Sequence, residues 1–169
     1  MHVTAAFYRG KERASSRFLA WWARSDYSHC ELILSRRGDL FECASSSMMD
    51  GGVRVKWIKL NPAHWELLDV PADPDKVRAW ATAWEIDERA AALGMVRAWF
   101  DEHEGERYDL PGLLGFVVRR IKGWLRAWWC SEACTDALGW VDSWRFDVAS
   151  FLALARTLGR PHRGEFSLT

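Results

Sequence analysis

Apolar and polar residues alternate along several short stretches of the first part of the chain. In one of them, His29 to Leu34, the alternation places His29 and Glu31 on one face of a strand. Asp39 to Ala44 alternates in the same way after the expected turn Ser35–Gly38, so the two stretches predict a β-hairpin. Further strands are predicted at Val3–Tyr8, Val53–Leu60 and His64–Val70. About five short successive strands indicate a mostly antiparallel sheet.

Beyond Pro71 the pattern changes to a helical period. Asp73 followed by Pro74 predicts a helix start, and helical periodicity continues to Ala92 and, after Gly94, to about Glu102. The tetrapeptide Val-Arg-Ala-Trp occurs at 77–80 and again at 96–99, so we expect either a helical hairpin or one long bent helix. Other helical or strongly apolar segments are expected at Ser15–Ala23, 111–121, 124–129, Cys130–Leu138 and Asp147–Leu158.

Strands followed by helices predict an α+β fold. A chain of 169 residues suggests one domain, which we place at residues 1–159, followed by a polar C-terminal tail over 160–169. Twelve tryptophans indicate a Trp-rich core, with a few of the rings lining a groove.

Charge, hydropathy and cysteine content argue against a nucleic-acid-binding protein, a membrane-spanning protein and a disulfide-stabilised secreted protein. Lys and Arg total 23 and Asp and Glu total 23, so the chain lacks the excess positive charge that proteins use to bind nucleic acid. Residues 1–10 lack the apolar run of a signal peptide, and no stretch reaches the roughly 20 apolar residues of a membrane span. We therefore expect synthesis in the cytoplasm, with the four cysteines reduced and no structural disulfides.

A cysteine opens one of the predicted helices, in the sequence Trp128-Trp129-Cys130-Ser131-Glu132. The positive end of a helix favours the thiolate and lowers the thiol pKa, and backbone N–H groups there can bind an oxyanion. Cys130 is therefore a candidate nucleophile, although its position alone suits a buried structural thiol equally well.

A cysteine nucleophile needs a base, and the chain has five histidines. His29 opens a predicted strand, and His64, at the start of another, competes with it. A two-residue hairpin loop at Ser35-Arg36 or Arg36-Arg37 would place Glu42 on the same face as His29, whereas a three-residue loop would separate them. The two simpler registers predict Glu42 as the residue that orients His29.

Three motifs occur in an order that resembles a known family. They are Tyr-Ser-His-Cys-Glu-Leu-Ile-Leu from Tyr27, Gly-Asp-Leu-Phe-Glu-Cys-Ala from Gly38, and Trp-Cys-Ser-Glu-Ala-Cys from Trp129. Together they resemble the circularly permuted NlpC-type papain-like cysteine hydrolases, YiiX-like branch. Tyr108-Asp109 with Gly112-Leu113-Leu114-Gly115 resembles the segment that precedes the cysteine helix in that branch. The resemblance extends over roughly residues 3 to 155.

The resemblance implies a fold and an origin. The fold is an antiparallel sheet with the cysteine helix packed on it, and the origin is a bacterium or a phage. The helical stretch over about residues 73–102 departs from the family pattern and is expected to be an insertion that covers the groove.

The resemblance also implies hydrolysis of an amide bond, for instance in a cell-wall peptide, without a metal or another cofactor. Cys130 would attack the carbonyl carbon, His29 would act as acid and then as base, and Glu42 would orient His29. The Cys130 N–H is the expected oxyanion donor. Additional oxyanion or pocket residues are expected to be Tyr8, Tyr27, Ser28, Trp129 and Ser131.

Three alternatives remain open from the sequence. The same triad could serve an acyltransferase or deacylase that acts on lipid or thioester acyl groups. The fold could instead be an inactive binding module, which a wide gap between His29 and Cys130 would indicate. Last, Cys30, Cys43, Cys130 and Cys134 could bind a metal. The substrate is in each enzymatic case a peptide or an acyl-bearing small molecule.

Overall fold

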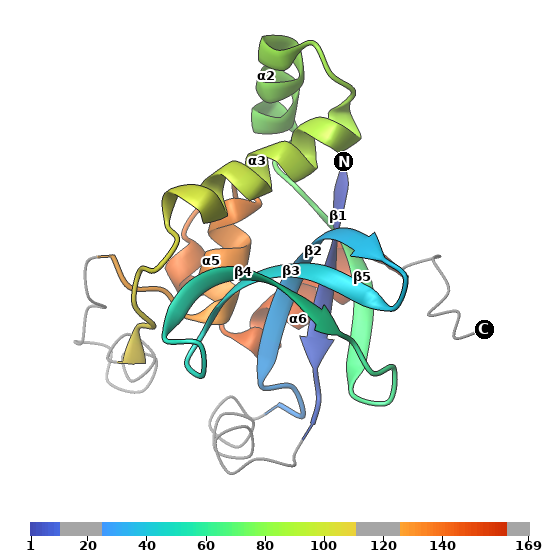
Figure 1. Ribbon diagram of the computed structural model, residues 1–169. Coiled ribbons are helices and arrows are strands. Elements are labelled where there is room, and N and C mark those ends of the chain that lie inside the picture. Colours follow the sequence, from blue (N-terminus) through green and yellow to red (C-terminus); the bar gives the residue numbers. More distant parts are fainter. Residues whose placement is uncertain (11–24, 111–125, 162–169) are drawn as a thin grey trace.

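A computed structural model describes residues 1–10, 25–110 and 126–161 (Figure 1). These residues form a mixed α+β fold, as predicted, in which every strand pairing is antiparallel. The sheet has six strands in the order β4-β3-β2-β1-β5-β6. The strands are β1 His2–Tyr8, β2 His29–Arg37, β3 Leu40–Ser47, β4 Gly52–Lys59, β5 Trp65–Pro71 and β6 Arg160–Pro161. The helices are α2 Pro74–Trp84, α3 Glu88–Glu102, α5 Cys130–Ala137, α6 Val148–Leu158 and the short 3₁₀ helix η1 Ser143–Arg145.

The β2–β3 hairpin is longer than its sequence pattern predicted. Arg37 pairs with Leu40, so the expected turn Ser35–Gly38 was wrong and its first three residues belong to β2. Gly38 makes the tight turn possible, because its φ of 61° is one that residues with a side chain rarely adopt. The register of the hairpin also shifts between Ile33 and Ser35, which indicates a bulge.

The helical stretch after β5 consists of two helices. The Asp73 carboxylate caps α2 by accepting the backbone N–H groups of Asp75 and Lys76 at 2.9 and 3.0 Å. Glu85 ends α2 with a φ of 52°, and Asp87 caps α3 in the same way as Asp73 caps α2. Of the two arrangements that the repeated tetrapeptide allowed, the structure therefore has the helical hairpin.

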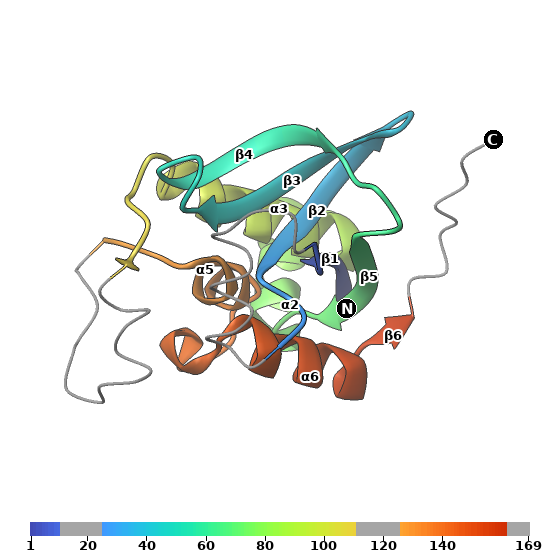
Figure 2. The same ribbon diagram turned by 90° about the horizontal axis from the view of Figure 1, so that it is seen from below.

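One hydrophobic core lies between the sheet and the helices. The tilted rings of Phe7 on β1 and Phe151 on α6 lie 5.1 Å apart at its centre. Val96 and Phe100 of α3 and Val77 of α2 are buried in this core, although α2 also projects from the body of the molecule (Figure 1). Figure 2 shows α5 and α6 on the same side of the strands.

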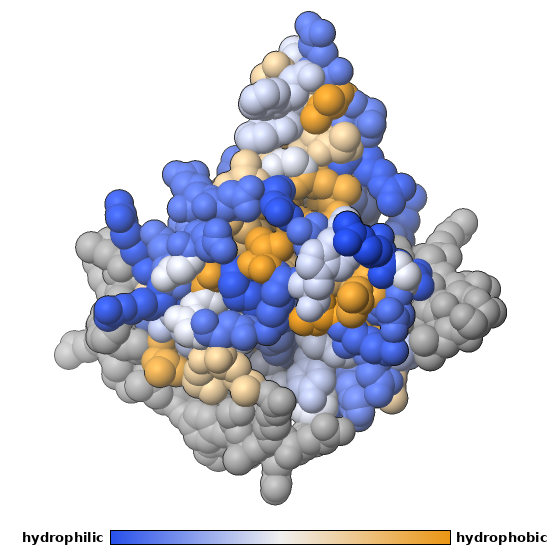
Figure 3. All heavy atoms as spheres, viewed as in Figure 1, coloured by the Kyte–Doolittle hydropathy of each residue, from blue (hydrophilic) through white to orange (hydrophobic). Residues whose placement is uncertain are grey.

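The other face of the sheet carries a smaller cluster. It consists of Ala6, Phe41, Cys43 and Leu60, with half-buried apolar side chains around it. On the molecular face drawn in Figure 3, hydrophobic residues form patches among hydrophilic ones.

Part of the expected tail belongs to the sheet, because Arg160 and Pro161 pair with Asp69 and Leu68 of β5. The helices expected at Ser15–Ala23 and within 111–121 lie outside the described residues. None of the described helices is long and apolar enough to cross a membrane.

Candidate active site

The first residue of α5 is Cys130, and the chain that leads into this helix is fixed to β3. The Trp128 N–H donates to the carbonyl of Arg107 at 2.9 Å, and the Ser46 hydroxyl donates to the carbonyl of Trp128 at 2.5 Å. Trp129, in extended conformation, is the N-cap residue. Because α5 packs on β2 and β3, these contacts hold the positive end of the helix against the start of β2.

His29, the first residue of β2, meets Cys130 there. The His29 ring is in hydrogen-bonding range of the Cys130 thiol, which is buried. Its Nε2 atom lies 2.9 Å from Oε1 of Glu31, two residues further along the same strand face. This contact leaves Nδ1 for the thiol. The side chain of His29 remains 23% exposed, whereas Cys130 is buried, so the imidazole is the more accessible member of the pair.

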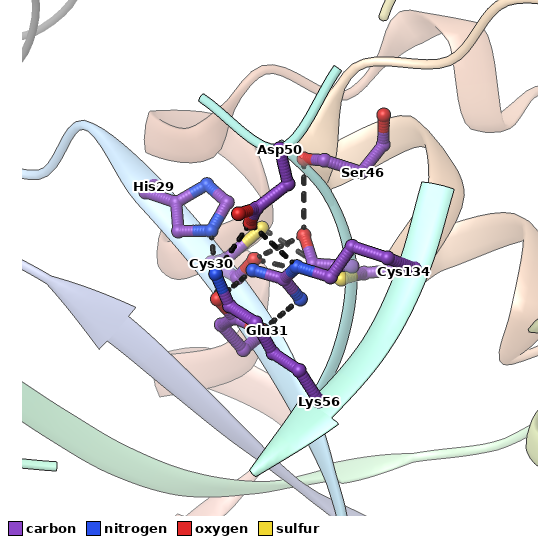
Figure 4. A network of polar contacts seen from close by, with 9 residues as sticks. His29, Cys30, Glu31, Ser46, Asp50, Lys56 and Cys134 are labelled. Carbon is purple, nitrogen blue, oxygen red and sulfur yellow. Dashed lines mark hydrogen bonds and ion pairs between the residues drawn. The ribbon is translucent and has the colours of Figure 1, made fainter. Parts of the chain in front are cut away.

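Glu31 is held by two contacts with one arginine. Arg54 on β4 donates from Nη1 to Oε2 at 2.7 Å and from Nη2 to Oε1 at 2.6 Å. Asp50 in turn accepts from Nε of Arg54 at 2.8 Å and from Nζ of Lys56 at 2.6 Å. Figure 4 shows these groups as one continuous network that begins at His29. Since Glu31 is only 2% exposed, the bidentate pair fixes its carboxylate in one orientation.

The electrostatics favour a thiolate–imidazolium pair. Burial alone lowers the pKa of His29, but hydrogen bonds with Cys130 and Glu31 outweigh it and raise that pKa from 6.5 to about 10. The pKa of Cys130 is held well below its usual value by hydrogen bonding from Cys30 and from His29, against the opposing effect of burial. Burial opposes ionisation of Glu31 too, yet Arg54 and His29 lower its pKa to about 2.

Glu42 does not occupy the position that the sequence predicted. Its carboxylate accepts from Nη1 of Arg97 on α3 at 2.6 Å and from the Ser35 hydroxyl at 2.9 Å. The prediction that Glu42 orients His29 was wrong because it assumed a short hairpin. In the longer hairpin Glu42 pairs with Ser35, six residues from His29 in sequence, and Glu31 contacts the imidazole in its place.

Two of the expected pocket residues lie beside His29. Tyr8 is its direct neighbour on β1, and the Tyr8 ring packs on Trp65 with centroids 5.0 Å apart. Trp65 also meets the His29 ring edge-on at 6.4 Å. Ser28 is buried, and its hydroxyl has no hydrogen-bond partner within the described parts of the chain.

The other expected pocket residues have structural partners. The Tyr27 hydroxyl donates to Glu66 and accepts from Arg156. The Trp129 indole N–H and the Ser131 hydroxyl both donate to the carbonyl of Phe146, at 3.0 and 2.7 Å. His64, the competing base, packs against Tyr8 with ring centroids 6.4 Å apart.

All four cysteines are free and buried. Cys43 belongs to the cluster on the other face of the sheet, whereas Cys30 and Cys134 lie near Cys130. Over residues 1–10, 25–110 and 126–161, no three or more His, Cys, Asp or Glu side chains are grouped so that they could hold a metal ion. The geometry therefore gives no support to the four-cysteine metal site.

Several residues of the site were not predicted. Glu31 could have been recognised, because His-x-Glu in a strand places both side chains on one face. Arg54 gave no sequence signal, since its contact with Glu31 depends on the pairing of three strands. Tyr108 is a further neighbour, with a pKa raised by burial and by the negative charge of Cys130.

Glu132 is a carboxyl group in the first turn of α5. It accepts a hydrogen bond from the Trp129 backbone, the reciprocal contact of a capping box. Burial, with Asp109 and Asp136 nearby, raises its pKa from 4.5 to about 8. A largely neutral Glu132 adds little negative charge beside the thiolate at neutral pH.

No model of a known protein family matches this chain, and no curated protein matches it.

Proposed function

We propose that this protein is a cysteine hydrolase that cleaves an amide bond through an acyl-enzyme, with Cys130 as nucleophile, His29 as acid and base, and Glu31 as the orienting residue. One observation carries the proposal. A thiol at the start of a helix, a half-buried imidazole and a carboxylate fixed by Arg54 follow one another in hydrogen-bonding range. This is the order of groups that activates a cysteine nucleophile.

In the proposed reaction the Cys130 thiolate attacks the carbonyl carbon and forms a C–S bond. The oxyanion is stabilised by backbone N–H groups in the first turn of α5. When the C–N bond breaks, the imidazolium of His29 gives its proton to the departing amine. Water then attacks the thioester while His29 takes its proton, which releases the acid and restores the thiolate.

The arrangement of the elements supports membership of the permuted papain-like group that the motifs resemble. The histidine strand precedes the cysteine helix in the chain, and that helix packs on an antiparallel sheet. The departure is the third residue, which lies on the histidine strand itself. Cell-wall peptides are one amide-containing substrate class that this group would suggest.

A second candidate activity is acyl transfer or deacylation on ester or thioester substrates. The aromatic rings of Tyr8 and Trp65 beside His29 favour it, because such rings can hold an apolar acyl chain. A panel of peptide anilides and of p-nitrophenyl esters with short and long chains separates the two candidates. Preference for long-chain esters over anilides would support the second.

Alkylation by iodoacetamide across pH, with the modified cysteine identified by mass spectrometry, tests the activated pair. We expect Cys130 to react well below the roughly 8.5 pKa of a free thiol, and to react about tenfold more slowly at pH 6 in His29→Ala. Cys43 is the internal control, because burial raises its pKa. If Cys130 reacts as an ordinary thiol and ignores His29, the protein is a binding module rather than a cysteine hydrolase.

A further inference from the structure

A second carboxylate contacts the arginine that holds Glu31. Asp50 accepts from Nε of Arg54 at 2.8 Å, whereas the two Nη atoms of Arg54 donate to Glu31 at 2.7 and 2.6 Å. The guanidinium therefore lies between two carboxylates, and only Glu31 also contacts His29 (Figure 4). Since the Arg54 side chain is 12% exposed, water and salt screen these contacts weakly.

Charges of opposite sign alternate along this network. Nζ of Lys56 lies 2.6 Å from Oδ2 of Asp50 and ends the series at the protein surface, where its side chain is 40% exposed. The alternating positive and negative groups are, in order, those of His29, Glu31, Arg54, Asp50 and Lys56.

Arg54 fixes the Glu31 carboxylate, but it also opposes the electrostatic effect of that carboxylate on His29. A guanidinium bound to both oxygens of Glu31 cancels much of the negative charge that the imidazolium meets. Two carboxylates and one guanidinium leave one negative charge in excess, whereas Glu31 and Arg54 alone would be neutral. Asp50 supplies that excess charge.

The position of the network decides which group of the catalytic pair it affects. Glu31 contacts Nε2 of the imidazole, which leaves Nδ1 for the thiol of Cys130. The charges of the network are therefore nearer to the imidazolium than to the thiolate, so an excess negative charge favours the charged pair. Burial opposes ionisation of Asp50, but Lys56 and Arg54 outweigh it and lower its pKa to about 2.

We propose that Asp50 is a positioning residue of the active site, whose charge offsets that of Arg54 and so leaves Glu31 free to stabilise the imidazolium of His29. This inference rests on the proposed function, because it assigns a part of the same site. It reconciles two requirements that Arg54 alone sets against each other, a fixed orientation of Glu31 and an uncompensated negative charge beside the imidazole.

The test compares the pH profile of Cys130 alkylation by iodoacetamide in wild type and Asp50→Asn. The amide keeps an oxygen that can accept from Arg54, so this substitution removes mainly the charge. We expect the profile to shift to higher pH and alkylation at pH 6 to slow about three- to tenfold. Lys56→Met in the Asp50→Asn background should restore part of the rate, because it removes a positive charge from the same network.

Asp39→Asn is the matched control. Asp39 pairs with Lys59 at 2.6 Å, at the other end of β3 and β4 from Asp50, so its substitution should leave the rate within about twofold. Asp50→Ala makes the same charge change if Asp50→Asn does not fold.

Three results would each overturn the proposal. They are an unchanged profile in folded Asp50→Asn or Asp50→Ala, an equal shift in Asp39→Asn, and no recovery on adding Lys56→Met. The proposed function would then still stand if His29→Ala slows Cys130 alkylation, and it fails by itself if wild-type Cys130 is unreactive.

Discussion

Glu31 and Glu42 lie on the same hairpin but have different partners. Glu31 contacts the imidazole and Arg54, whereas Glu42 pairs with Arg97 and so attaches α3 to β3. A carboxylate that orients a histidine acts on catalysis, and one that joins two elements acts on stability. The two residues can therefore be separated by experiment.

We expect Glu31→Gln to reduce hydrolysis and low-pH alkylation of Cys130 roughly 10- to 100-fold, because the imidazolium loses its negative partner. Glu42→Gln should leave both rates within about twofold. Glu31→Gln removes one of the two carboxylates that pair with Arg54 and leaves Asp50 as the other, so thermal unfolding must be followed in parallel. Glu31→Gln combined with Arg54→Met serves as the control that removes both charges. A larger catalytic loss in Glu42→Gln than in Glu31→Gln would contradict the assignment.

The choice between these carboxylates also shows the limit of the sequence at this scale. Cys130 and His29 could be chosen as candidates from the sequence, because the cysteine stands at the start of a predicted helix and the histidine at the start of a predicted strand. Strand alternation placed Glu31 beside His29, but Glu42 was preferred through an assumed turn. A bulge and a turn three residues later than expected decide the register, and neither is encoded in the alternation itself.

At the scale of elements, a close backbone approach at Gly52 positions the segment before α5. Gly52 pairs with Arg107, which pairs in turn with Ala127. A Cβ atom at residue 52 would lie 1.8 Å from the carbonyl oxygen of Glu106. The start of β4 thus contacts the segment around Arg107, which in turn pairs with the segment that leads into α5.

We expect Gly52→Ala to lower the free energy of unfolding by about 1–3 kcal/mol and to slow Cys130 alkylation, because the segment must move away from β4. Gly51→Ala is the control. Gly51 has a φ of 85° and open space around it, so its substitution costs only the backbone strain of roughly 1 kcal/mol and leaves Cys130 unchanged. Urea unfolding and alkylation at neutral pH measure both effects. Equal effects of the two variants would show that the approach at Gly52 is not what positions α5.

The elements were more predictable than their contacts. The ends of β1, β4 and β5 lie within one residue of the predicted ones, and Asp73 and Asp147 cap the helices at which they were expected. The sequence did not decide whether the helical stretch breaks between α2 and α3. The break occurs at Glu85, which adopts a left-handed conformation that is uncommon for glutamate and therefore not predictable from the residue type. The docking of α3 through Arg97 and Glu42 depends on tertiary structure and had no local signal.

For the whole molecule, the buried charge network ties stability to pH. The pKa of Glu31 is lowered from 4.5 to about 2, so its contribution is present above pH 4.5 and is lost as the pH falls toward 2. Asp50, lowered to about 2 by Lys56 and Arg54 against the effect of burial, acts in the same direction.

We expect the free energy of unfolding of the wild type to fall by about 2 kcal/mol more between pH 6 and pH 3 than that of the Glu31→Gln, Arg54→Met double variant. Urea unfolding at the two pH values measures the difference. Parallel curves for the two proteins would mean that Glu31 is not ionised in the way the network requires.

The order of the elements along the chain has a consequence for biosynthesis. Cys30 and Cys134, whose sulfur atoms lie 3.9 Å apart in the folded protein, are 104 positions apart in sequence, and the strand with the proposed base is made long before the helix with the proposed nucleophile. A growing polypeptide therefore carries only the ordinary thiols of Cys30 and Cys43 during most of its translation. If Cys130 is the nucleophile that we propose, its thiol gains a lowered pKa only when the late helix α5 docks beside His29, so an incomplete chain on the ribosome carries no activated cysteine.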